Sequence, residues 1–364
     1  MLSSYCFSLR GRDHIKSNMP CHDASQIETI SSSWKIAVVA DGVGSCKHAE
    51  LASGIAVKEV TELIKKQFPP GNSQDQDYIH VIHAAMHGAA NAIEAYVEEQ
   101  DPGNESEYQT TLAVAVMSSK CLYYGNAGDS GIISLDEGGS YHLVTKKQND
   151  DMGRVYAIPS NRLFEVGKAD HISAAVLCMT DGIYDTAAPL ALRNHSFPVN
   201  VPFVNMFVTY GLGLEKAEER ETVEKCKNAL IRYLQSEECK MMTDDLSVAA
   251  LINTNSDLQP EEILWEEPKL DFYTLKWEEV SVYPSAETRN KLFKEYICEK
   301  NPDWSEEQVL ELLKKYAGEE VSEVKTKPEN EPEIEQKVKV EPEIENEGKK
   351  WGFWKKRGRD HDCI

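Results

Sequence analysis

Five aspartates in this sequence lie at strand ends or in turns of a predicted sheet: Asp23, Asp41, Asp129, Asp181 and Asp244. The clearest case is the decapeptide IAVVADGVGS, residues 36–45, in which an apolar run leads into Asp41 and Gly42. An Asp-Gly pair after a strand is common in ordinary turns, so Asp41 alone predicts only a turn. The repetition favours a site, because acids gathered at one end of a sheet repel each other unless cations lie between them.

The residue types indicate which cation such a group would bind. Mg²⁺ and Mn²⁺ prefer oxygen ligands, keep several waters and need only a few carboxylates each. The sequence offers no histidine pair at the spacing of a zinc site. His80, His83 and His87 share one predicted helix without a carboxylate at compatible spacing, and we interpret them as surface or core-edge residues. The acids therefore favour a two-metal oxygen site over a zinc site or a general acid/base pair.

Apolar patterns predict the segments that would position these acids. Short apolar runs bounded by Gly, Asp or Asn predict strands at 34–40, 110–118, 121–128, 130–135, 174–180 and 244–253. Helical spacing of apolar residues predicts helices at 49–68, 77–100 and 214–237. Because the strands often come in adjacent pairs and the helices in long blocks, the order favours antiparallel sheets with helices packed outside them.

The composition sets broad limits on function. The 364 residues, 41% of them hydrophobic, suffice for one large domain or two ordinary ones. The formal net charge of −22 argues against nucleic acid as a partner, although part of the acidity lies in the C-terminal tail. Nine cysteines without CxxC spacing indicate reduced thiols. Because we find no signal peptide and no apolar run long enough to cross a bilayer, we expect a cytoplasmic protein.

The sequence changes character along its length, and we expect four regions. Residues 1–254 would form a catalytic domain, and residues 255–318 a linker with a small helical module. Residues 319–349, rich in Glu, Pro and Lys, are expected to be a disordered linker. The basic and aromatic tail at 350–364 could contact an anionic membrane surface or a partner protein, or could serve only as a solubilising end.

Six short blocks, taken in order, carry a resemblance to a known family. They are CHDA, ADGVGS, QTTLAVAV, GNAGDS, MTDGIYD and DDLS, and each is weak alone. Their order and spacing over residues 3–253 resemble the metal-dependent protein phosphatases, the type 2C serine/threonine phosphatases, and most of all their bacterial branch. The resemblance implies an α+β fold, a four-layer α-β-β-α sandwich of two antiparallel sheets flanked by helices, with two Mg²⁺ or Mn²⁺ ions at one edge.

The resemblance also implies ligands for these two ions. Asp41 resembles the carboxylate that bridges both metals, and Gly42 resembles the residue whose backbone carbonyl binds beside it. Asp181 and Asp244 resemble ligands of one of the two ions. The implied reaction is a direct hydrolysis, in which a water that bridges the ions attacks phosphorus in line and no phosphoenzyme forms.

Two further aspartates would serve the same centre less directly. Asp23 resembles an acid that acts through metal-bound water. Asp129 stands where the family often holds a weaker third ion with the help of the Asp181 position. The implied substrate is a phosphoprotein with a cognate serine/threonine kinase, and cations at the site would let an acidic protein accept a phosphate.

Some positions depart from the family pattern and bear on the phosphate contacts. Asn18 stands where an arginine often clamps the phosphate, so Arg10, Arg12 or His14 from the preceding segment could take that role. Arginine suits it best, because its fork of donors matches phosphate geometry. Val43 stands where some members have a histidine that is a candidate general acid, which leaves protonation of the leaving group to water or His14.

Other departures concern the neighbouring turns. His22 stands where a carboxylate is common; it could hold a water, bind a softer ion or simply fill a turn. Gly131 stands where an arginine often follows the Gly-Asp-Ser block. Cys46, just after the Asp41 turn, could be a redox-sensitive thiol near a helix start, but a small residue packed under the turn is the simpler interpretation.

The sequence leads to one main hypothesis and one alternative. The main hypothesis is Mg²⁺- or Mn²⁺-dependent hydrolysis of phosphoserine and phosphothreonine in proteins. The alternative is a catalytically weak or inactive module of the same fold that binds a regulatory partner. The presence of Asp41, Asp181 and Asp244 favours the enzyme, whereas the departures at positions 18, 22 and 131 keep the alternative open.

Overall fold

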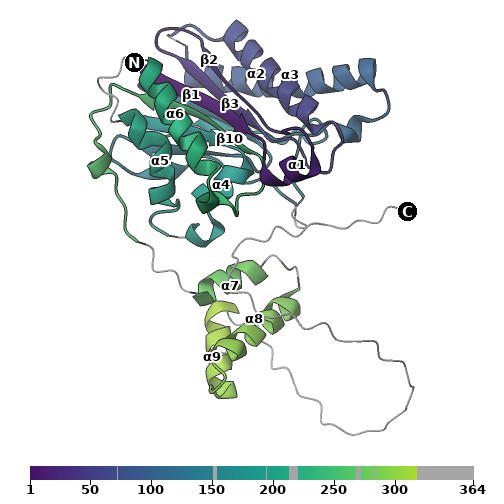
Figure 1. The fold of residues 1–364 in the computed structure, drawn as a ribbon, viewed down its shortest axis with the longest axis vertical. Coiled ribbons are helices and arrows are strands. Elements are labelled where there is room, and N and C mark those ends of the chain that lie inside the picture. The colour runs from purple at the N-terminus through teal and green to yellow at the C-terminus, as the bar shows by residue number, and fades with distance from the viewer. Residues whose placement is uncertain are drawn as a thin grey trace.

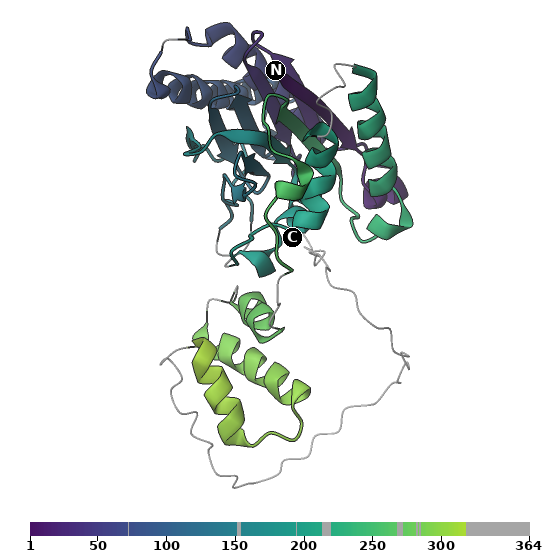
Figure 2. The same ribbon diagram turned by 90° about the vertical axis from the view of Figure 1, so that its left-hand side faces the viewer.

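Two five-stranded antiparallel sheets stack face to face, and helices cover the outer face of each sheet (Figures 1 and 2). The computed structural model describes residues 1–71, 73–150, 154–193, 195–212, 220–267, 272–281, 283 and 285–317. The strand orders are β1-β10-β9-β6-β7 and β2-β3-β4-β5-β8. This arrangement confirms the expected α+β class and the four-layer sandwich.

The strands of each sheet are short and pair with sequence-distant as well as neighbouring segments. The first sheet contains β1 (Leu2–Leu9), β6 (Gly131–Asp136), β7 (Tyr141–Leu143), β9 (Ser173–Met179) and β10 (Leu246–Asn253). The second contains β2 (Ala24–Thr29), β3 (Lys35–Ala40), β4 (Leu112–Met117), β5 (Leu122–Ala127) and β8 (Glu165–Lys168). All six predicted strands are confirmed. Strands β1, β2, β7 and β8 were not expected from the sequence.

Strand β3 shows why the inner strands carry unbroken apolar runs. Ile36, Val38 and Ala40 face the helices on the outside of the second sheet, whereas Ala37 and Val39 face the first sheet across the sandwich. Successive side chains of a strand point to opposite faces, so a strand that is covered on both sides must be apolar at every position. The central layer of the core therefore lies between the sheets, with a second layer under each set of helices.

The outer layers are formed by helices from different parts of the chain. Helices α2 (Ala49–Gln67) and α3 (Asp75–Gln100) cover the second sheet, as predicted. Helices α4 (Asp181–Ala187), α5 (Val201–Leu212) and α6 (Arg220–Leu234) cover the first sheet. The short helix α1 (Arg12–Ser17) follows β1. The helix predicted at 214–237 is present as α6, and residues 213–219 lie outside the described part; α4 and α5 were not expected.

A separate cluster of helices follows the sandwich. Helices α7 (Phe272–Val280), α8 (Ala286–Lys300) and α9 (Glu306–Ala317) enclose a core of their own, with Phe293 and Ile297 fully buried (Figure 2). Helix α7 also touches the turn η2 (Leu190–Leu192) of the sandwich. In the described ranges, no helix is both long and apolar enough to span a lipid bilayer. The regions predicted at 319–349 and 350–364 lie outside the described residues.

Candidate metal centre

The predicted aspartates meet at one end of the sandwich because of the strand register. Ala24 at the start of β2 pairs with Ala40 at the end of β3, so Asp23 and Asp41 are neighbours across the pair. In the other sheet, the end of β9 pairs with the starts of both β10 and β6. The acids just beyond those strand ends are Asp181, Asp244 and Asp129.

Three of these carboxylates form a compact group. Asp41, Asp129 and Asp181 each offer an oxygen, and the three oxygens lie within 4.8 Å of one another. Burial raises the pKa of Asp41 well above its ordinary value, and the like charges of Asp181, Asp23, Asp129 and Asp244 raise it further. Holding such a group ionised is therefore costly without a counter-charge. A divalent cation among these oxygens would remove that cost.

The threonines at the start of the β4 region hold the backbone of Asp41. The Asp41 N–H donates to Thr111 Oγ1 at 2.9 Å, and the Thr111 N–H donates back to the Asp41 carbonyl at 2.8 Å. Thr110 Oγ1 donates to the same carbonyl at 2.9 Å. These bonds fix the position of the Asp41 backbone without using its carboxylate. They give Thr110 and Thr111 a structural task beside the acid group.

Gly42 follows Asp41 at a point where the backbone of other segments comes very close. A Cβ atom at this position would lie 2.6 Å from the carbonyl oxygen of Ala49 and 2.7 Å from that of His22. The Gly42 N–H also donates to the His22 carbonyl at 3.2 Å. Only glycine fits here without moving the start of α2, so the Asp-Gly pair is part of a packed junction and not merely an exposed turn.

Asp23 and Asp244 flank the compact group. Thr180 Oγ1 donates to Asp23 Oδ2 at 2.7 Å. Burial raises the pKa of Asp23 well above its ordinary value; this hydrogen bond opposes the increase, and the nearby charges of Asp245 and Asp181 add to it. Asp244 lies near enough to raise the pKa of Asp41 but is not one of the three oxygens within 4.8 Å. All five predicted aspartates thus share one electrostatic environment.

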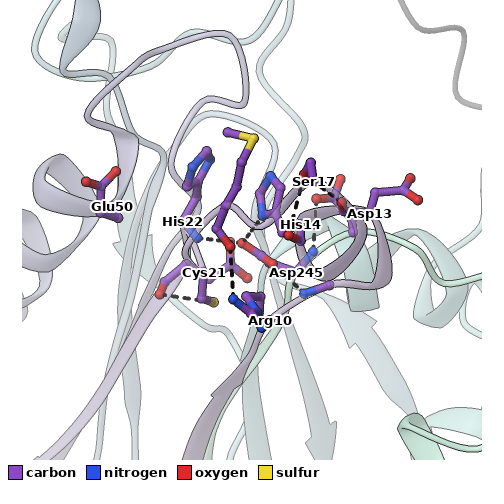
Figure 3. A network of polar contacts seen from close by, with 12 residues as sticks. Arg10, Asp13, His14, Ser17, Cys21, His22, Glu50 and Asp245 are labelled. Carbon is purple, nitrogen blue, oxygen red and sulfur yellow. Dashed lines mark hydrogen bonds and ion pairs between the residues drawn. The ribbon is translucent and has the colours of Figure 1, made fainter.

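Beside this centre lies a group of residues that we call the wall: Arg10, Gly11, His14, His22 and Asp245 (Figure 3). Asp245 holds this group together. Its carboxylate accepts hydrogen bonds from the N–H groups of Gly11 and His22, each at 2.5 Å. It also lies 2.9 Å from Nδ1 of His14, and only 2% of its side chain is exposed. Asp245 therefore ties the segment after β1 and the segment before β2 to the start of β10. Sequence reasoning assigned a role to Asp244 but none to its neighbour.

Two imidazoles lie side by side above Asp245 in Figure 3. The ring centres of His14 and His22 are 4.3 Å apart. Burial, and then the neighbouring His14, lower the pKa of His22, which favours its neutral form. Nδ1 of His22 and Oε2 of Glu50 are buried without a hydrogen-bond partner in the part of the chain described. Buried polar atoms of this kind can be satisfied by water, which fits one of the three interpretations of His22.

The candidate phosphate-binding arginines differ in their contacts. Arg12 donates through Nη2 to the carbonyls of Gln235 and Ser236, at 2.8 and 2.6 Å, just beyond the end of α6. Its guanidinium is thus occupied in binding the last carbonyls of that region. Arg10 donates to the Met19 carbonyl through a longer bond of 3.3 Å and lies beside Cys21 in Figure 3. The Arg10 guanidinium is therefore less engaged in hydrogen bonds to backbone carbonyls than that of Arg12.

Cys46 and Lys147 differ in how well the sequence predicted them. Cys46 is buried, and its Sγ lies 3.2 Å from the carbonyl of Ser106. Burial raises the pKa of its thiol, so Cys46 is a packed, protonated residue under the turn and not an activated thiolate. Lys147, which the sequence did not single out, forms an ion pair with Asp185 on α4, the helix that begins at Asp181. No motif spacing marks Lys147, because its position depends on a contact between distant segments.

Several solved structures are similar to this chain. The serine/threonine phosphatase Stp1 from Staphylococcus aureus is 14% identical, with 70% of this chain and 95% of that chain covered and a TM-score of 0.48. The serine/threonine phosphatase of S. agalactiae is 13% identical, with 69% and 99% covered and a TM-score of 0.48. RsbX, solved in complex with magnesium, is 14% identical, with 69% and 94% covered and a TM-score of 0.41.

The family comparison is more decisive than these distant structures. No curated protein sequence matches the chain. The model of the family described as protein phosphatase 2C, however, matches residues 10–235. This segment includes Asp23, Asp41, Asp129 and Asp181 and spans more than half of the 364 residues. The chain therefore belongs to the protein phosphatase 2C family, the serine/threonine protein phosphatases that its sequence blocks resemble.

Proposed function

We propose that this chain hydrolyses phosphoserine and phosphothreonine in proteins with the help of Mg²⁺ or Mn²⁺. The observation that supports this most is the group of three carboxylate oxygens, from Asp41, Asp129 and Asp181, within 4.8 Å of one another. Family membership supports the substrate class, a phosphoprotein modified by a serine/threonine kinase. The magnesium in the similar RsbX structure is in line with the choice of cation.

The donor set suits hard divalent cations. It contains only oxygens, and burial together with mutual repulsion makes the metal-free, fully charged group unfavourable. The residues that would hold the ions are Asp41, Gly42 through its carbonyl, Asp181, Asp244, Asp23 and Asp129. When bound, such cations would lower the pKa of a water between them and offset negative charge on the phosphoryl oxygens.

The remaining catalytic tasks would fall to residues of the wall. Arg10 would bind phosphoryl oxygens, for which its planar fork of donors is well suited. His14 would give a proton to the leaving oxygen through Nε2, because Asp245 holds its Nδ1 at 2.9 Å. Asp245 would act as a positioning residue that fixes the ring. Asp23 would orient water at the centre from its buried position beside Thr180.

We also propose that catalysis resides in residues 1–254 and that residues 255–318 are a linker and a small helical module; Leu258 and Ile263 of the linker pack into the core under the first sheet. All candidate site residues come from the first region, whose core layers lie under and between the two sheets. Helices α7–α9 enclose their own core around Phe293. The tail at 350–364 would then serve a partner or an anionic surface rather than the reaction.

A phosphatase assay on the full chain tests the proposal. We expect hydrolysis of p-nitrophenyl phosphate and of a phosphothreonine peptide with Mn²⁺ or Mg²⁺, loss of turnover in excess EDTA, and its return when Mn²⁺ exceeds the chelator. The reason is that the acid group needs cations both to hold its shape and to receive a phosphate. Turnover that continues unchanged in EDTA would refute metal dependence. No turnover with Mn²⁺ at micromolar enzyme would refute the enzyme assignment.

A further inference from the structure

The loop after β7 is tied to the turn that carries Asp129. The Gln148 N–H donates to the carbonyl of Gly128 at 2.9 Å, and the Gly128 N–H donates to Gln148 Oε1 at 3.1 Å. Gly128 has a φ of +92°, so this turn has a fixed shape that favours glycine. These two bonds place Lys147, the residue before Gln148, beside the turn at Asp129.

The side chain of Lys147 reaches across to helix α4. Its ammonium forms an ion pair with Asp185 and lies 5.8 Å from the centre of the Tyr184 ring. Both partners lie on the helix that begins at Asp181, and Asp185 follows Asp181 by four residues, which puts the two carboxylates on one face. Only 23% of the Lys147 side chain is exposed. The ammonium is therefore held between the Asp129 turn and the helix face that carries Asp181.

The Lys147 side chain carries its positive charge at neutral pH. Burial lowers the pKa of Lys147, but the carboxylates of Asp185, Asp129 and Asp181 outweigh it, so that its pKa is above the ordinary value. The Lys147 ammonium is thus attracted by Asp129 and Asp181, two of the three carboxylates of the compact group. Because like charges repel each other in a partly buried site, the ammonium opposes a divalent ion bound by these two carboxylates.

We propose that the positively charged side chain of Lys147 takes the place of a third divalent ion beside Asp129 and Asp181, two members of the compact group. The inference rests on the proposed metal centre and refines it: the centre would hold two divalent ions, and Lys147 would offset part of the negative charge of Asp129 and Asp181. Lys147 is a positioning residue in this arrangement, since it acts through the carboxylates and not on the substrate. The weaker third ion that the family resemblance implies is then replaced by a side chain.

Counting bound Mn²⁺ tests this inference without reference to activity. Electron paramagnetic resonance of free Mn²⁺ and titration calorimetry on the full chain are expected to show two ions for the wild type. For Lys147→Met, we expect a third ion, or binding of the weakest ion that is tighter by about tenfold or more, because a repelling charge is gone. Lys147→Arg keeps the charge and should behave as the wild type.

Lys168 provides a matched control. Its ammonium pairs with Asp75 at 2.9 Å and lies 5.8 Å from the centre of the Tyr123 ring, so it has the same types of partner as Lys147, an aspartate and a tyrosine, but at β8 and away from the acid group. Lys168→Met should therefore leave Mn²⁺ binding unchanged. The double variant Lys147→Met/Asp185→Asn removes both charges of the ion pair together, and it should show the same gain in Mn²⁺ binding if Lys147→Met folds poorly.

The outcomes separate this inference from the function on which it rests. Unchanged stoichiometry and affinities in Lys147→Met and in the double variant, beside a wild type that binds two ions, would overturn the role of Lys147 and leave the metal centre standing. A wild type that already binds three ions would also overturn it. A wild type that binds no Mn²⁺ would refute the metal centre itself, and this inference with it.

Discussion

Replacing Asp41 by Asn is expected to lower kcat/KM for p-nitrophenyl phosphate by about 10³-fold or more at saturating Mn²⁺. The amide keeps the shape of the carboxylate, and the bonds from Thr110 and Thr111 to the backbone remain, so the change removes a charge and little else. A carboxylate that helps to hold the cations contributes several kcal/mol to the transition state, and about 1.4 kcal/mol corresponds to a tenfold change in rate. Steady-state kinetics measures the loss.

Measuring the free energy of unfolding of Asp41→Asn shows whether its loss of activity comes only from a loss of fold. The raised pKa of Asp41 means that its ionised form opposes folding, a cost that is absent at low pH and grows as the pH rises above the ordinary value of an aspartate. At neutral pH the metal-free Asp41→Asn protein should therefore be at least as stable as the wild type. Asp170→Asn, with a 99% exposed side chain, is a control expected to keep full activity. An Asp41→Asn enzyme within threefold of the wild type would contradict the proposed role.

Replacing His14 by Gln is expected to slow hydrolysis in a way that depends on the leaving group. General acid catalysis contributes about 10²–10⁴-fold when the departing oxygen is strongly basic. We therefore expect a loss of about 100-fold with a phosphoserine peptide, whose leaving group is an alkoxide, but only a few-fold with p-nitrophenyl phosphate. A series of substituted phenyl phosphates measures this as a steeper dependence of kcat on the pKa of the leaving phenol.

The comparison needs one control away from the site and one variant that weakens the contact between His14 and Asp245. His80→Gln, a matched change at an exposed position of α3, should leave both substrates unaffected. Asp245→Asn keeps an oxygen for one backbone donor but can no longer hold Nδ1 of His14 as a carboxylate does, so it should show the same substrate pattern as His14→Gln. Equal losses on both substrates in His14→Gln would indicate a merely structural role and contradict the proton transfer.

The positions of the acids were predictable because they follow from strand ends. Each buried strand of the sequence stops at a turn residue, and in antiparallel sheets the end of one strand lies beside the start of the next. The apolar runs ending near Asp41 and Asp181 therefore indicated the strands β3 and β9. These strands belong to different sheets, so the meeting of the two acids was indicated by the repetition of acids and by the family resemblance instead. The placement of helices outside the sheets followed from the same patterns.

The unexpected elements have weaker local signals. Strand β1 has only two buried residues, Leu2 and Phe7, so it lacks an apolar run, and its partner β10 lies more than two hundred residues away. The short helix α4 has buried residues that pack on the first sheet, which stabilises a helix too short to form alone. In both cases tertiary packing decides the structure.

Contacts between distant segments also explain why sequence reasoning missed the charged residues Asp245 and Lys147. Asp245 is identified as part of the wall only through its bonds to Gly11, His14 and His22, all more than two hundred residues away in the chain. Lys147 lies beside the compact group only because its loop is bound to Gly128. Neither contact leaves a spacing in the sequence, whereas the Asp-Gly pairs of the metal centre do.

Equilibrium binding of Mn²⁺ to the purified full chain tests the central claim most directly. In titration calorimetry, we expect saturable uptake by the wild type, and binding that is weaker by about 100-fold or more in Asp41→Asn, because the carboxylate at the centre of the group is lost. The metal-free proteins should otherwise unfold alike or with the variant slightly more stable. Absence of saturable binding to the wild type, or equal binding to both proteins, would contradict a metal centre built on Asp41, Asp129 and Asp181.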